Sequence, residues 1–72
     1  MLTFKRIFHE NGTMRYEFYP EGDVLAAGIV EFSAQGEGKI IKESLRDFHG
    51  RYAHHALYHI DTDREIGTVA WY

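Results

Sequence analysis

Hydrophobic and polar positions divide the chain into short segments, and the periodicity changes at glycine-containing turns. The first of these turns is Asn11-Gly12, which lies between two runs rich in apolar residues. Asn-Gly in this setting is a strong signal for a two-residue β-hairpin turn, because both residues tolerate the positive φ that such a turn requires. The pattern therefore predicts an N-terminal hairpin in which Phe8 lies opposite Arg15.

Continued without interruption, this register places Phe4 opposite Tyr19 and gives the hairpin apolar residues on both faces. The first face carries Ile7, Met14, Tyr16 and Phe18. The second face carries Leu2, Phe4, Phe8 and Tyr19, with Arg6, Arg15 and Glu17 among them. The alternation alone does not decide which of the two faces belongs to the core.

Three further segments follow the hairpin. Pro20 and Gly22 indicate a turn, since proline presets φ and glycine accepts positive φ. Residues 24–32 are rich in β-branched and small side chains, which predicts one long central strand. Residues 33–38 contain two glycines and are predicted to be a loop, and residues 39–43 are predicted to form a short strand paired with the preceding one.

From Ser44 onward the apolar positions change to helical spacing. The predicted helical stripe consists of Leu45, Phe48, Tyr52, Ala56 and Ile60. Ser44 or Asp47 can act as the N-cap, and Gly50 favours a late start of the helix. The acidic residues after Ile60 would oppose the helix dipole, so the helix is predicted to end there. Residues 66–72 then form the last strand.

The predicted element order is βββ(β)αβ, which defines an α+β fold. We expect two layers, a mainly antiparallel sheet of four or five strands and one α-helix on one face. Because a single helix covers a single face, the second sheet face would meet water or a partner.

Length and composition limit the function classes. The chain has 72 residues, which predicts a single domain over residues 1–72. Its net charge of −3 disfavours non-specific nucleic-acid binding. Charges interrupt its apolar N-terminal stretch, which is unlike a signal peptide, and no segment is apolar enough to cross a membrane. We therefore expect a cytoplasmic protein without membrane contact.

The main functional hypothesis is a non-enzymatic module for protein–protein interaction that binds another protein or forms a homodimer. Aromatic and arginine side chains on the second hairpin face motivate it, because large exposed apolar patches usually mark contacts. The hypothetical interface consists of Phe4, Arg6, Phe8, Arg15 and Tyr19, with Trp71 and Tyr72 at an adjacent edge.

Two alternatives belong to other classes. Aromatic side chains beside Arg6 and Arg15 resemble a stacking surface for single-stranded nucleic acid, although Glu17 and the acidic total count against it. His55 and His59 are spaced i, i+4 and could take part in a metal site or a pH sensor.

Catalysis has little support in the sequence. The chain has no cysteine, and neither of its two serines lies in a nucleophile-elbow motif, so we expect neither an enzyme nor a cofactor. For the histidines, packing in or beside the helix is the simpler interpretation, because His49 and His59 fall within the apolar stripe.

Three short segments resemble small uncharacterised proteins of Gram-positive bacteria and of their mobile elements. They are residues 19–23 (YPEGD), 51–56 (RYAHHA) and 67–72 (GTVAWY). The resemblance implies a cytosolic protein of bacterial or phage origin. It implies no activity and assigns no site residue.

Overall fold

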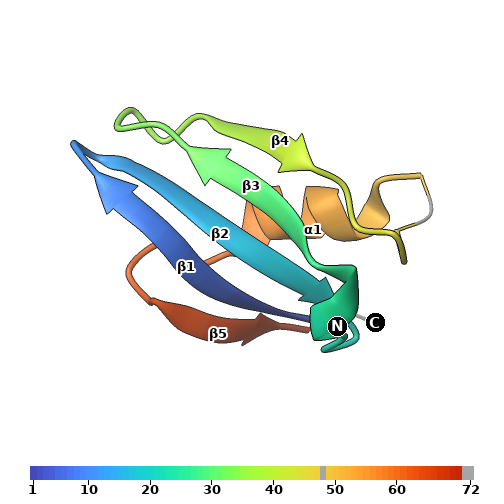
Figure 1. The fold of residues 1–72 in the computed structure, drawn as a ribbon. Coiled ribbons are helices and arrows are strands. Elements are labelled where there is room, and N and C mark those ends of the chain that lie inside the picture. The colour runs from blue at the N-terminus through green and yellow to red at the C-terminus, as the bar shows by residue number, and fades with distance from the viewer. Residues whose placement is uncertain (48, 71–72) are drawn as a thin grey trace.

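The computed structural model describes residues 1–47 and 49–70 and shows one sheet with one α-helix packed on it (Figure 1). The elements in chain order are β1 (Leu2–Glu10), β2 (Thr13–Pro20), the short 3₁₀ helix η1 (Val24–Ala26), β3 (Gly28–Phe32), β4 (Gly38–Lys42), α1 (Arg51–His59) and β5 (Ile66–Val69). The strand order is β4-β3-β2-β1-β5, and every neighbouring pair is antiparallel. The predicted two-layer α+β class is confirmed.

The first hairpin departs from its predicted register at a β-bulge. Its turn forms as expected, with φ of 53° at Asn11 and 83° at Gly12, and Phe8 pairs with Arg15. The register then shifts between Arg6 and Phe8, and Phe4 pairs with Phe18. One extra residue in a strand moves all side chains beyond it to the other face. The prediction that Phe4 lies opposite Tyr19, on the face away from Phe18, was therefore wrong.

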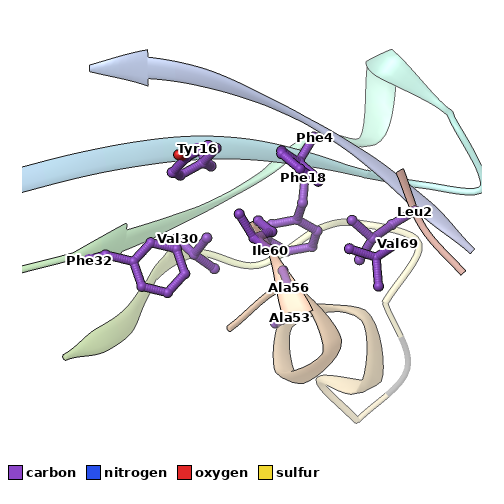
Figure 2. Packing of buried hydrophobic residues seen from close by; sticks show 10 residues of the cluster. All are labelled: Leu2, Phe4, Tyr16, Phe18, Val30, Phe32, Ala53, Ala56, Ile60 and Val69. Carbon is purple, nitrogen blue, oxygen red and sulfur yellow. The ribbon is translucent and has the colours of Figure 1, made fainter. Parts of the chain in front are cut away.

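The bulge gathers the large apolar side chains on the face that α1 covers (Figure 2). The buried cluster consists of Leu2, Phe4, Tyr16, Phe18, Val30, Phe32, Ala53, Ala56, Ile60 and Val69. The Tyr16 ring lies edge-on to Phe4 at 5.7 Å and to Phe32 at 5.9 Å between centroids. The helix contributes the small side chains Ala53 and Ala56, and these let α1 approach the sheet closely.

Aromatic residues pair across strands with glycines in this core. The pairs are Phe4 with Gly67, Phe18 with Gly28, and Phe32 with Gly38. A Cβ atom built on Gly28 would lie 2.2 Å from Cζ of Phe18, so the phenyl ring occupies the space that a side chain would need. The glycines therefore give room to the aromatic rings that fill the core.

Asp47 caps the helix from outside its first turn. Its carboxylate accepts hydrogen bonds from the backbone N–H groups of Tyr52 and Ala53, both at 3.0 Å, and these are two of the donors left without partners at a helix start. Gly50, with φ of 72°, immediately precedes α1, so the late start is confirmed. Ser44 lies too early to cap the helix and instead donates a hydrogen bond to the carbonyl oxygen of Ala26.

Other boundaries also differ from the prediction. The expected strand over residues 24–32 begins with η1, because the Asp23 side chain accepts a hydrogen bond from the N–H of Leu25 at 3.0 Å. The last strand ends at Val69 within the described residues, and the predicted continuation over Trp71 and Tyr72 lies outside them. No helix among the described residues is long and apolar enough to cross a membrane.

Candidate functional site

The structure separates the residues of the hypothetical interface. Phe4 is buried beneath the helix, and Arg6 is turned toward the same side by the bulge. Phe8, Arg15 and Tyr19 lie on the opposite side of the sheet, here called the open face. Trp71 and Tyr72 lie outside the described residues. The predicted five-residue surface is therefore not continuous.

Arg6 holds the connection between α1 and β5 in place. Its Nε donates to the Tyr16 hydroxyl at 3.2 Å, and its Nη2 donates to the carbonyl oxygen of Thr62 at 2.9 Å. The Tyr16 hydroxyl also lies within hydrogen-bond distance of the carbonyl oxygens of Thr62 (3.3 Å) and Arg64 (3.2 Å). These contacts explain the half-buried position of Arg6 and commit it to a structural role.

Charged groups on the open face neutralise one another across the strands. Arg15 lies with its guanidinium carbon 5.0 Å from the centroid of the Phe8 ring, and its Nε is 2.7 Å from the Glu31 carboxylate. Lys39 binds the same carboxylate at 3.2 Å. Hydrogen bonds from Arg15 and then Lys39 lower the pKa of Glu31. The Phe8 and Arg15 side chains therefore already contact each other, and they are less available to stack on nucleic-acid bases.

Tyr19 on the same face also forms a hydrogen bond with a charged neighbour. Its hydroxyl donates to the Glu17 carboxylate at 3.2 Å. Burial, followed by the charge of Glu17, raises the pKa of Tyr19. A face with both charge signs paired in rows is typical of a solvated sheet surface.

Four of the five histidines lie on or just before α1, and in the described residues they do not complete a metal site. The rings of His55 and His59 are stacked, with centroids 5.6 Å apart. Burial, followed by the charge of His59, lowers the pKa of His55. No group of three or more potential metal ligands occurs among the described residues, and Arg51 lines the same surface hollow. His49 and His59 are exposed, so their expected packing within the apolar stripe was wrong.

Three exposed aliphatic side chains lie on η1 and on the segment after β4, two segments that contact each other. Val24, Leu25 and Leu45 are exposed to 67 %, 90 % and 92 %, and together they are called the end patch. Sequence reasoning missed it, because Val24 and Leu25 fell within a predicted strand and Leu45 within the helical stripe. The capping residue type at Asp23 was the available signal for a helical turn there.

Two links brace the end patch. Ser44, the residue before Leu45, donates its hydroxyl to the carbonyl of Ala26, and this contact is buried. Arg46, the residue after Leu45, forms an ion pair with Asp23 at 3.3 Å. The two segments that carry the exposed aliphatic side chains are therefore joined to each other, and the side chains are presented from a fixed backbone.

Fold and surfaces together define a small α+β domain with a covered sheet face, a charged open face and an apolar end. Compared with known proteins, the chain matches no family model, and no curated protein or solved structure gives a significant match.

Proposed function

We propose that this chain is a non-enzymatic protein-interaction module that inserts the end patch into an apolar pocket of another protein. The observation that carries the proposal is the nearly complete exposure of Leu25 and Leu45 on two segments that are braced together. A single exposed leucine is ordinary on a protein surface, whereas several together are typical of a contact site. The expected setting is the bacterial cytosol that the sequence resemblance implies.

The shape of the surface favours another protein as the partner at this site. Side chains exposed to 90 % protrude, and protruding anchors are complementary to a concave pocket. Three surface hollows of the described residues are lined mainly by polar and charged side chains. None of these three would receive a leucine from a second copy favourably.

A photo-crosslinking amino acid at position 25 would test the proposal in the producing cell, with position 58 as the matched exposed control. Tyr58 is exposed to 78 % on α1 and lies outside the end patch. We expect a protein that crosslinks from position 25 and does not crosslink from position 58. Mass spectrometry then identifies this protein for purification.

Binding of the purified partner gives the decisive measurement. Leu25→Glu and Leu45→Glu should each weaken binding at least about tenfold, because a carboxylate would enter an apolar pocket. Tyr58→Glu adds the same charge elsewhere and should leave binding within about twofold. Thermal unfolding of the variants should match that of the parent, since the substituted side chains are exposed. Equal crosslinking at both positions, or binding unaffected by both leucine substitutions, would contradict the proposal.

A further inference from the structure

The two outer strands of the sheet differ in how they resist pairing with another strand. β4 carries Lys39 and Lys42, and its pairing with β3 contains a register shift. Charges and bulges of this kind block edge-to-edge association. β5, at the other edge, has the sequence Ile-Gly-Thr-Val, with no charge and no proline, and all four residues pair regularly with β1. Of the two outer strands in the described residues, β5 is therefore the one without charges and without a register shift.

Hydrogen-bond directions show which groups of β5 point outward. The N–H of Arg6 donates to the carbonyl of Glu65 at 2.7 Å, so Glu65 directs its backbone toward β1. In an antiparallel sheet the direction alternates from residue to residue. Gly67 and Val69 therefore also face β1, whereas the N–H and C=O groups of Ile66 and Thr68 face away from the sheet. No strand of the described residues lies on that side of β5.

We propose that two copies of this chain pair through β5 in an antiparallel, two-fold symmetric arrangement centred on Gly67. Ile66 of each copy then lies opposite Thr68 of the other. Each of these two pairs exchanges two backbone hydrogen bonds, which makes four in total. All four outward groups of each edge are used, and the two five-stranded sheets join into one sheet of ten strands.

Charge and symmetry both favour a second copy as the occupant. Symmetric pairing through β4 would bring lysines together, whereas symmetric pairing through β5 places uncharged strand residues opposite each other. The absence of a side chain on Gly67 suits the centre, where opposing backbones approach most closely. Ile66, exposed to 63 %, would cover the methyl group of the opposing Thr68.

The size of the contact sets its strength. Strands of four residues bury far less than the roughly 800 Å² per partner of a standard interface. We therefore expect a weak dimer, with a Kd on the order of 100 µM. The proposed pairing uses backbone groups of β5 and no residue of the end patch, so different variants test the pairing and the proposed function.

Analytical ultracentrifugation from 10 µM to 1 mM tests the inference. The average mass of the unmodified protein should rise from 8.4 kDa toward twice that value. Thr68→Lys introduces the charge that protects β4 and should keep the protein monomeric. Thr68→Pro removes an outward N–H without removing a bond to β1, and it should have the same effect. Leu25→Glu is the matched control and should dimerise like the parent.

Several results of these measurements would reject pairing through β5. Parent protein that stays monomeric at 1 mM would overturn the inference, as would undiminished association of a folded Thr68→Lys variant. Association that Leu25→Glu abolishes would place the contact at the end patch and likewise reject pairing through β5. NMR on a mixture of labelled and unlabelled chains should show a strong nuclear Overhauser effect between the Hα atoms of the two Gly67 residues, which lie at the centre of the proposed pairing. Dimerisation without this signal would reject the proposed β5 register.

Discussion

Substitution of Gly28 by alanine tests how the core is built around its glycines. Gly28 pairs with Phe18 across β2 and β3, and its φ lies outside the left-handed region. An added Cβ would lie 2.2 Å from Cζ and 2.4 Å from Cε1 of Phe18, and 2.9 Å from the carbonyl oxygen of Lys42. The change is therefore purely steric, because alanine can adopt this backbone conformation.

The expected cost follows from the burial of Phe18. Its side chain is fully buried, so the ring cannot move toward solvent to make room. Overpacking of this kind costs about 1–3 kcal/mol, and contact with both a ring and a backbone oxygen favours the upper part of that range. A domain of 72 residues has roughly 4–11 kcal/mol of total stability. Gly28→Ala should therefore lower the melting temperature by about 15 °C.

Urea unfolding followed by far-UV circular dichroism measures the effect, and a double-mutant cycle assigns its cause. Phe18→Leu alone should cost about 1–2 kcal/mol, less than the 3–5 kcal/mol of a full truncation to alanine. Combined with Gly28→Ala, it should cost less than the sum of the single changes, because the shorter side chain makes room for the methyl group. Additive effects, or a Gly28→Ala variant as stable as the parent, would refute the steric explanation.

Four other predictions concern the bulge, the helix cap and two titrating groups. Deletion of Ile7 removes the extra residue of the bulge, so all other side chains should stay on their present faces. Urea unfolding should show a change of about 1 kcal/mol in the free energy of unfolding. Loss of cooperative unfolding would contradict this prediction. Asp47→Ala should cost about 1–2 kcal/mol in the same assay, because two N–H groups lose their acceptor. The pKa of Glu31 is lowered in the folded state, so its contribution to stability is present above pH 4.5 and is lost as the pH falls below that value. The difference in melting temperature between the parent and Glu31→Gln should therefore shrink as the pH falls below 4.5. The pKa of His55 is lowered from 6.5 in the folded state, so protonation of its ring favours unfolding as the pH falls. By NMR the His55 ring should titrate below pH 6.5. His59→Ala should raise the pKa of His55, because it removes the neighbouring charge.

Sequence patterns predicted the helix, strands and turns of this fold better than they predicted the sheet face on which each strand side chain lies. The Asn11-Gly12 turn, the late helix start and the order of the strands along the chain all follow from local signals and are confirmed. The bulge at Ile7 gave no such signal, because an uninterrupted register also places large apolar residues on both faces of the hairpin. Its position depends on which side chains fit against Tyr16 in the folded core, and that is a tertiary property.

The candidate surfaces were harder to predict for the same reason. Phe4 and Arg6 were assigned to a contact surface because the alternation was continued through the bulge. Leu45 was assigned to the helix because its spacing from later apolar residues fits a helical stripe. Periodicity indicates which positions are apolar together, but it does not show where a segment stops being helical. Exposure of the end patch depends on the links between Asp23 and Arg46 and between Ser44 and η1.

The bulge also decides which apolar side chains are buried. Without the shift at Ile7, a single helix would leave Leu2 and Phe4 uncovered on the far side of the sheet, and that side would be the natural interface. With the shift, both residues enter the core and the open face retains mainly paired charges. The most exposed aliphatic side chains, Leu25 and Leu45, then lie in the end patch, and Ile66 is exposed on β5 at the edge of the sheet. Both proposed contacts therefore lie at an end or an edge of the sheet, and neither uses the open face.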